Sequence, residues 1–321
     1  MNKIKPLKIG KTILKNNLFL APMAGYTDIA FRQICREMGA GLTTTEMVSS
    51  RALVFDNEKT KELMSVSKNE TPSSIQLFGS NPRDFDIIAK NGVLDKFDLI
   101  DINMGCPMPK IVKNGDGSAL MGKPDIATKI VETLYKLNKT VTVKVRLGII
   151  DKLNAVDYAK KMQDAGASLV CVHGRTAKQL YTGDADWDAI GEIANKLTVP
   201  VVGNGDIVCE KDAIKKLTDY PVKGIMIGRA AITNANIFAR IINEELPFEK
   251  KVKIVSIKEI ILKHMKYCKK YFKEKFVVAS LRKHFAYSIK SFYGSKELKL
   301  KLMNSNSLDE IVKLIKSTPL L

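Results

Sequence analysis

Short apolar stretches alternate with segments of helical periodicity over the first three quarters of the chain. The apolar stretches are rich in β-branched residues, and most are bounded by Gly, Pro, Asn or Asp, which predicts buried strands. The predicted strands cover residues 18–21, 42–46, 74–78, 99–103, 140–146, 169–172, 201–203 and 224–227. Between them, apolar residues recur at helical spacing, and the predicted helices include 27–38, 82–90, 124–137, 154–165, 188–196 and 209–217.

This alternation predicts an α/β fold with a parallel sheet. The strands are almost continuously apolar, as expected when both faces of a sheet are covered. Eight β/α units within about 240 residues predict a TIM (β/α)8 barrel. A doubly wound open sheet is the alternative, because a count of strands does not show whether the sheet closes.

The pattern becomes purely helical after residue 253. Apolar residues keep helical spacing over 255–275, 276–292 and 308–315, which predicts a small helical bundle. The charged segment 244–253, with Pro247 inside it, is the expected boundary. We therefore predict a barrel domain over residues 1–244 and an all-helical domain over residues 245–321.

Composition places the chain among ordinary globular proteins. It has 321 residues, of which 45% are hydrophobic and 27% are charged. Its apolar runs are too short to span a membrane, and its basic N-terminus lacks the apolar core of a secretory signal. Its five cysteines form no C-x-x-C pair, which disfavours a zinc site or a disulfide framework. We expect a cytoplasmic protein with no bound metal and no obligate protein partner.

Positive charge is concentrated near the C-terminus. Residues 245–321 contain 18 basic and 7 acidic residues, whereas the remaining 244 residues contain 34 and 27. The formal net charge of the whole chain is +18. This asymmetry suggests a polyanion such as nucleic acid as a partner of the helical domain, although solvated lysines on amphipathic helices give the same pattern.

Polar and glycine-rich residues follow the predicted strands. In a TIM barrel these strand ends form the active site. Glycines after the last two strands suit a phosphate group, because they let backbone N–H groups approach an anion. Lys144 lies inside an apolar strand, and inside a barrel its charge would need an anionic partner such as a reduced flavin. Gln76 and His173 are further candidates for cofactor contacts, although each also fits a structural role.

Cys106 is the first candidate for chemistry. It lies in the segment Gly105-Cys106-Pro107, directly after a predicted strand, whereas the other cysteines lie in helical or strand patterns. A thiol with a pKa of about 8.5 is mostly protonated at neutral pH. It can therefore act as a proton donor as well as a nucleophile.

These segments, in this order, resemble the tRNA-dihydrouridine synthases, and most closely their bacterial DusB-type branch. The strand-end segment with the cysteine is the most discriminating, and Lys283 and His284 lie in a looser match to the helical domain of the family. The matching segments are 21–28 (APMAGYTD), 76–79 (QLFG), 101–107 (DINMGCP), 115–121 (GDGSALM), 142–148 (TVKVRLG), 172–176 (VHGRT), 203–207 (GNGDI) and 226–231 (MIGRAA).

The resemblance implies FMN at the barrel mouth, NADPH as the electron donor, and tRNA held partly by the helical domain. It makes Cys106 the catalytic acid and places Asn103 and Arg175 near the target uridine. The FMN contacts it implies are Pro22, Met23, Ala24, Gln76, Lys144, His173, Asn204, Gly205, Asp206, Gly228 and Arg229.

The implied reaction reduces the C5=C6 bond of uridine in tRNA to 5,6-dihydrouridine. Hydride would add at C6, and a proton donor on the far side of the ring would protonate C5. The target base would have to leave the RNA stack to enter the pocket. Two alternatives are an FMN barrel oxidoreductase acting on a small molecule, similar to dihydroorotate dehydrogenases, and an RNA-binding protein without catalysis.

Overall fold

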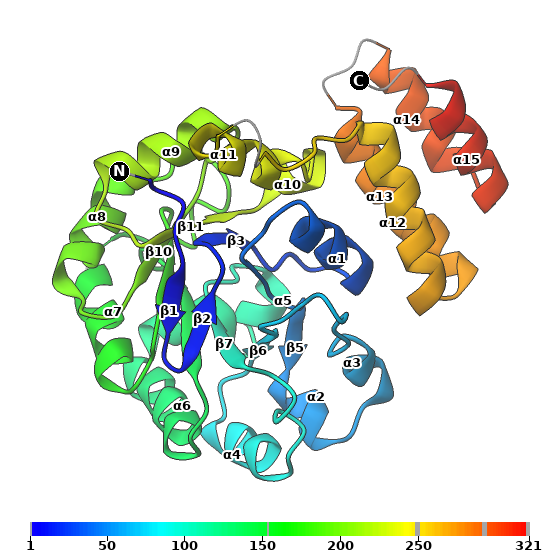
Figure 1. The fold of residues 1–321 in the computed structure, drawn as a ribbon. Helices are drawn as coiled ribbons and strands as arrows, with labels where there is room; N and C mark the ends of the chain where they lie inside the picture. Colours follow the sequence, from blue (N-terminus) through cyan, green and yellow to red (C-terminus); the bar gives the residue numbers. More distant parts are fainter. Residues whose placement is uncertain (1, 153, 248–250, 291–293, 319–321) are drawn as a thin grey trace.

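A ring of helices surrounds a parallel sheet, and a separate group of helices packs against one side of this ring (Figure 1). The fold is taken from a computed structural model, which describes residues 2–152, 154–247, 251–290 and 294–318. No helix in these residues is long and apolar enough to cross a membrane.

The strands of the large sheet run in the order β4-β3-β11-β10-β9-β8-β7-β6-β5, and each pairs in parallel with its neighbours. The two edge strands belong to one stretch of chain that residues 44–46 interrupt, so the sheet closes on itself through the backbone. The strands are β3 (Leu18–Leu20), β4 (Leu42–Thr43), β5 (Met47–Ser49), β6 (Ser74–Phe78), β7 (Leu99–Met104), β8 (Val141–Arg146), β9 (Val170–His173), β10 (Val201–Asn204) and β11 (Gly224–Ile227). The predicted TIM barrel is confirmed, and the predicted strand 42–46 contains β4 but ends before β5 begins.

Helices cover the outside of the barrel where their apolar faces meet the outward side chains of the strands. Alternate strand residues such as Ile100, Ile102 and Met104 lie in this outer core. The barrel helices are α1 (Ile29–Glu37), α2 (Ser50–Val54), α3 (Glu58–Glu62), α4 (Pro82–Lys90), α5 (Pro109–Val112), the 3₁₀ helix η1 (Gly117–Gly122), α6 (Pro124–Lys136), α7 (Ala155–Asp164), α8 (Trp187–Lys196), α9 (Glu210–Asp219), α10 (Arg229–Thr233) and α11 (Ile237–Glu245).

A hairpin of β1 (Leu7–Ile9) and β2 (Thr12–Leu14) lies across the opening at the start of the strands (Figure 1). Its side chains Leu7, Ile9 and Leu14 join the inward residues of the barrel in one buried cluster. The barrel therefore has a packed apolar floor, and its opposite end carries the polar strand termini. The sequence pattern did not predict this hairpin, because its strands are only three residues long.

The C-terminal helices α12 (Ile257–Tyr271), α13 (Glu274–Ser288), α14 (Ser295–Asn304) and α15 (Leu308–Ser317) form a unit with its own core. We call this group the helical unit. The helix predicted over 255–275 corresponds to α12, which ends a few residues earlier, at Tyr271. The chain is extended at Phe272 and Lys273, so α13 folds back on α12, and the rings of Phe272 and Phe276 stack with centroids 4.1 Å apart. Part of the helix predicted over 276–292 lies outside the described residues.

The helical unit is anchored at the start of α1. The Asp28 carboxylate caps α1 by accepting from Phe31 N, and it also accepts from Ser280 Oγ at 2.9 Å and from His264 Nε2 at 3.4 Å. Although burial alone would lower it, the pKa of His264 is raised to about 10 by this carboxylate, so the pair is ionised. The barrel loop before α1 also contacts the helical unit through two backbone carbonyls. Lys283 Nζ donates to Gly25 O, and His284 Nε2 faces Tyr26 O.

Candidate functional site

Strand alternation places the polar site residues inside the barrel. Residues between the outward-facing Ile and Val side chains must point inward, and at the floor end these are apolar, such as Leu99, Cys171 and Val202. Nearer the ends of the strands they become polar, and all but the half-buried Lys144 remain buried. These inward residues are Gln76, Asp101, Asn103, Thr142, Lys144, Arg146, His173 and Asn204.

Cys106 lies in the loop after β7, half-buried at the barrel mouth. Its backbone N–H donates to Asn103 Oδ1 at 2.9 Å, and its carbonyl accepts from Ser118 N. A side chain at Gly117 would come within 2.7 Å of the Cys106 carbonyl, and Gly117 has φ of +60°. Only glycine therefore fits beside the cysteine. Burial raises the pKa of the Cys106 thiol, which keeps it protonated near neutral pH.

Buried side chains from three strands are linked to the Cys106 loop. Thr142 Oγ1 and Gln76 Nε2 each donate to the Asp101 carboxylate at 2.7 Å. Asn103 Nδ2 donates to Gln76 Oε1 at 2.9 Å, and the other end of that amide accepts from Cys106 N. Burial raises the pKa of Asp101 to about 6. The amide groups of Gln76 and Asn103 are thus held by each other and by the protein.

Lys144 reaches across the barrel interior from β8. Its Nζ donates to Asn204 Oδ1 at 3.1 Å, and Asn204 Nδ2 donates in turn to Met226 O. Among the described residues, Lys144 forms no ion pair with a carboxylate, so its charge is held by a neutral amide. Burial lowers the pKa of Lys144, and the nearby Arg146 guanidinium acts in the same direction.

Positive charge dominates one side of the mouth. Arg175 is 2% exposed and binds the Asp206 carboxylate through Nη2 at 2.7 and 2.9 Å, and Arg229 approaches the same carboxylate at 3.4 Å. Arg146 donates only to the carbonyls of Gly105, Thr176 and Leu180 within the described part of the chain. Burial, together with these cations and Lys144, lowers the pKa of His173 to about 2, so this imidazole is neutral.

The backbone at Gly205 and Asp206 is constrained. Gly205 has φ of +130°, and a Cβ there would lie 2.5 Å from Ala185 Cβ. Asp206 has φ of +50°, which is unusual for a residue with a side chain, and Arg175 and Ala185 N hold its carboxylate. Strained backbone of this kind often marks a functional site.

The loop after β3 meets the end of β11 at the mouth. Ala21 N donates to Ile227 O, and Met23 is fixed by its bonds with Thr27. A Cβ at Gly228 would lie 3.5 Å from Met23 Sδ, an ordinary contact distance. Pro22, Met23 and Ala24 therefore border the same opening as Gly228.

Most of the sequence-predicted site residues lie at the carboxyl ends of the barrel strands or in the loops that follow, whereas Gln76 and Lys144 lie inside β6 and β8 and face the barrel interior. Sequence reasoning did not assign roles to Asp101, Thr142 and Arg146. Their inward register was a usable signal, because each lies two residues from a selected position on its own strand. The role of Gly117 could not be predicted from the sequence, since only the folded loop brings it close to Cys106.

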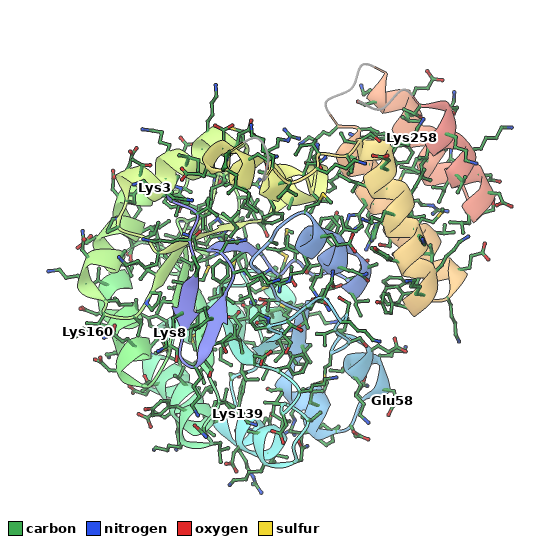
Figure 2. All side chains as sticks on the ribbon, in the orientation of Figure 1. Lys3, Lys8, Glu58, Lys139, Lys160 and Lys258 are labelled. Carbon is green, nitrogen blue, oxygen red and sulfur yellow. The ribbon has the colours of Figure 1, made fainter. Side chains whose placement is uncertain are left out.

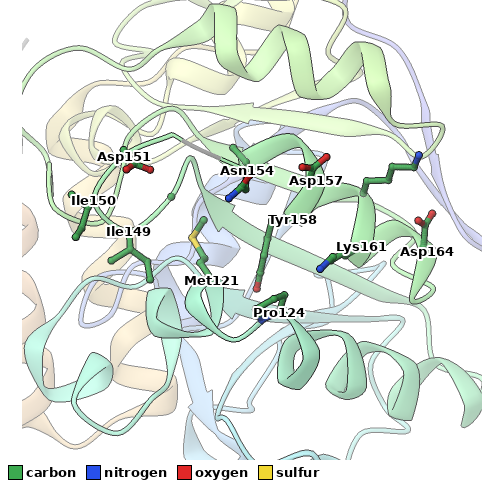
Figure 3. Close-up of a pocket in the computed structure, with 13 residues that line it drawn as sticks. Met121, Pro124, Ile149, Ile150, Asp151, Asn154, Asp157, Tyr158, Lys161 and Asp164 are labelled. Atoms are coloured by element: carbon green, nitrogen blue, oxygen red, sulfur yellow. The ribbon is translucent and has the colours of Figure 1, made fainter.

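A separate groove of about 750 Å³ lies outside the barrel between α6 and α7 (Figure 3). Met121, Ile149 and Tyr158 line it, together with Lys161 and Asp164. None of the predicted site residues lines this groove, so it is distinct from the mouth.

Comparisons with known proteins agree on one family. The family model described as Dihydrouridine synthase (Dus) matches residues 19–319. The chain is 34% identical over 300 residues to tRNA-dihydrouridine synthase B of Pseudomonas aeruginosa, covering 91% of this chain and 90% of that protein. It is 41% identical over 246 residues to a protein of Treponema pallidum described as probable tRNA-dihydrouridine synthase, covering 73% and 72% of the two chains.

Solved structures resemble the barrel at low sequence identity. Histamine dehydrogenase from Rhizobium sp. 4-9 superposes with a TM-score of 0.59 at 16% identity, over 82% of this chain and 50% of that one. A variant of NCR from Zymomonas mobilis gives a TM-score of 0.53 at 16% identity, over 77% and 92%. The chain spans about half the length of the first of these proteins. At such identities the likeness concerns the fold alone.

Proposed function

We propose that this chain, which belongs to the dihydrouridine synthase family, reduces the C5=C6 bond of uridine in tRNA to 5,6-dihydrouridine with a bound flavin. The observation that carries the proposal is the protonated thiol of Cys106, held at the mouth of a barrel whose interior holds the Lys144 ammonium without a carboxylate partner among the described residues.

The residues at the mouth fit a flavin. Lys144 is turned into the interior with no carboxylate partner among the described residues, and a reduced flavin is negatively charged at N1 and O2. Arg175 and Arg229 share the single carboxylate of Asp206, so their two positive charges face one negative charge. A phosphate would supply a further anion. This donor set suits a group that combines a ring anion with a phosphate.

We assign the flavin as FMN, because its single phosphate matches the glycine-rich ends of β10 and β11. Lys144 would hold the N1 and O2 side of the ring, and Gly228 and Arg229 would hold the phosphate. The residues we propose to contact FMN are Pro22, Met23, Ala24, Gln76, Lys144, His173, Asn204, Gly205, Asp206, Gly228 and Arg229.

In the reaction, bound flavin supplies the hydride that is added at uracil C6. Cys106 Sγ then donates its proton to C5 from the opposite face of the ring. Asn103 holds the Cys106 loop through its Oδ1 and lies beside the uridine. Arg175 binds Asp206 through Nη2, and its Nη1 lies 3.5 Å from His173 Nε2. We propose that Arg175 also lies near the uridine, as the family resemblance implies.

We propose NADPH as the electron donor, as the family resemblance implies. The donor enters by the same mouth as the uridine, because the hairpin and the apolar cluster close the other end of the barrel. We place the reaction in the cytoplasm.

We propose that residues 1–244 form the catalytic domain and residues 245–321 a tRNA-binding domain. Residues 245–321 contain 18 basic and 7 acidic residues. Lysines such as Lys266 and Lys269 are exposed on the helical unit. A target base stacked in folded RNA must turn outward to reach Cys106, and contacts to phosphates away from the base would hold the tRNA meanwhile. A small-molecule oxidoreductase would have no use for such a basic unit.

The direct test uses the purified full-length protein and tRNA isolated from cells that lack its gene. We expect a yellow protein whose released flavin has the mass of FMN, and uridines that gain two hydrogens when NADPH is added. Mass spectrometry of the digested tRNA measures this gain. A colourless protein that takes up no FMN would contradict the proposal.

We expect Lys144→Met to weaken FMN binding by about tenfold to hundredfold. The methionine keeps the length of the side chain but removes a charge-assisted hydrogen bond worth about 1.5–3 kcal/mol. Fluorescence titration of the apoprotein with FMN measures the affinity. The matched control is Lys160→Met, since Lys160 is exposed on the outer face of α7 (Figure 2). Equal FMN affinity in the two variants would remove Lys144 from the flavin site.

A further inference from the structure

We propose that Asp101 is a positioning residue, whose carboxylate sets the direction of the hydrogen bonds through Gln76 and Asn103 and so holds the Cys106 loop at the mouth. The inference rests on the proposed function, in which the Cys106 thiol protonates the uracil ring.

The argument begins with the ends of the chain of hydrogen bonds. At one end, the Asp101 carboxylate can only accept, and it accepts from Gln76 Nε2 at 2.7 Å. At the other end, the backbone N–H groups of Cys106 and Gly105 can only donate, and both donate to Asn103 Oδ1, at 2.9 and 3.2 Å. The two side-chain amides lie between an end that only accepts and an end that only donates.

Only one orientation of both amides satisfies these ends. If the Gln76 amide turned over, its carbonyl would face the Asp101 carboxylate, and two acceptors would meet. If the Asn103 amide turned over, its NH2 group would face the N–H of Cys106, and two donors would meet. Because these side chains are buried, each mismatch leaves polar groups without partners and costs about 1–3 kcal/mol.

Asp101 must be ionised to act in this way. Burial raises its pKa to about 6, and the Lys144 ammonium opposes that rise, so the carboxylate predominates near neutral pH. The polar groups facing it are Gln76 on β6, Thr142 and Lys144 on β8, and Cys171 on β9. Asp101 forms no ion pair among the described residues, although a buried carboxylate is costly. A residue that only filled space would be apolar.

The test compares Asp101→Asn with Thr142→Val in the full-length, flavin-loaded protein. An asparagine at position 101 can donate as well as accept, so this end no longer opposes reversal of the amides, and only the N–H groups of Cys106 and Gly105 still do. We expect the reversed state, in which the Cys106 loop loses its anchor, to be populated more than in the wild type. Thr142→Val also removes one hydrogen bond to Asp101. Thr142→Val keeps the Asp101 carboxylate, which can only accept. It is therefore the matched control, because it removes a hydrogen bond without changing the direction of the hydrogen bonds through Gln76 and Asn103.

Two measurements follow the position of Cys106. The first is the rate at which iodoacetamide alkylates Cys106, measured by peptide mass spectrometry with the half-buried Cys209 as internal reference. We expect this rate to rise in Asp101→Asn and to stay at the wild-type value in Thr142→Val. The second separates the half-reactions. We expect Asp101→Asn to slow reoxidation of the reduced flavin by tRNA about tenfold to hundredfold, while reduction by NADPH keeps its wild-type rate.

Equal alkylation and equal reoxidation rates in wild type, Asp101→Asn and Thr142→Val would overturn the inference. Flavin content and absorbance report whether Asp101→Asn has folded. If it has not, Asn103→Leu removes the last link of the chain and must show the faster alkylation instead. A wild-type protein whose flavin is not reoxidised by tRNA would contradict the proposed function, and the alkylation rates would still decide the role of Asp101.

Discussion

Replacing Cys106 with alanine is expected to lower the rate of dihydrouridine formation about 10²- to 10⁴-fold, the usual contribution of a positioned acid. The substitution removes the thiol proton without disturbing the loop, whose anchors are backbone groups bound to Asn103 and Ser118. FMN binding is expected to keep its wild-type affinity, because the proposed cofactor contacts come from other residues. Single-turnover assays with reduced enzyme and tRNA measure the loss.

The pH dependence of the wild-type rate identifies the acid further. Burial raises the pKa of the Cys106 thiol, so the proton donor persists through neutral pH and is lost only as the pH rises above that value. We expect the wild-type rate to fall on this alkaline limb and the residual rate of Cys106→Ala to lack it. Cys209→Ala is the control, since Cys209 is the other half-buried cysteine. A Cys106→Ala rate equal to that of Cys209→Ala would remove Cys106 as the acid.

The second large effect is expected at the contact between the barrel and the helical unit. Asp28→Asn should lower the free energy of unfolding by about 3–5 kcal/mol, because it leaves the buried His264 cation without its counter-charge. Asparagine keeps the cap on Phe31 N, so the loss reports the ion pair rather than the helix start. Urea unfolding followed by circular dichroism measures it. Asp125→Asn, at the exposed start of α6, should change the stability by less than about 1 kcal/mol.

The effect of Asp28→Asn depends on pH in a defined direction. The stabilisation from His264 is complete below its unfolded pKa of about 6.5 and is lost as the pH rises through about 10. The stabilisation from Asp28 is present above its unfolded pKa of about 3.9 and is lost as the pH falls toward its lower folded value. Burial lowers the pKa of His284, so that residue destabilises the fold as the pH falls below about 6.5.

The difference between wild type and Asp28→Asn should therefore be largest at about pH 5–7 and should shrink as the pH approaches the folded pKa of His264. A constant difference from pH 6 to above pH 10 would show that His264 is not the partner of Asp28. Loss of stability in Asp125→Asn as great as in Asp28→Asn would show that the effect belongs to helix starts in general.

The barrel could be predicted because its signal is local. The predicted ranges 74–78, 82–90 and 224–227 coincide with β6, α4 and β11. The starts of α1 and α4 are local features too, since a side-chain oxygen of Asp28 or Asn81 accepts from a free N–H of the first turn. The break predicted after residue 275 lies a few residues past the observed one at Phe272 and Lys273, because the apolar spacing continues across it and only the packing of α13 on α12 sets the turn.

The site could be predicted only as far as strand ends and motifs carry it. They led to Cys106 and Lys144, which lie where each strand meets the mouth. They could not indicate that Asp28 is buried against His264, more than two hundred residues away in the chain. Arg32 and Glu70 likewise form a buried ion pair at 2.7 Å that links separate segments of the chain. Pairs so distant in sequence leave no trace in local periodicity.

The hairpin of β1 and β2 closes one end of the barrel, so ligands reach the interior through the mouth at the other end. In the proposed reaction, nicotinamide and RNA both need the same face of the cofactor, and neither can reach it from the closed end of the barrel. The electron donor and the RNA therefore bind one after the other. Each catalytic cycle divides into a reductive and an oxidative half-reaction, and the reduced cofactor carries the electrons from one to the other. The closed end of the barrel thereby imposes alternate binding of the electron donor and the RNA at the opposite end.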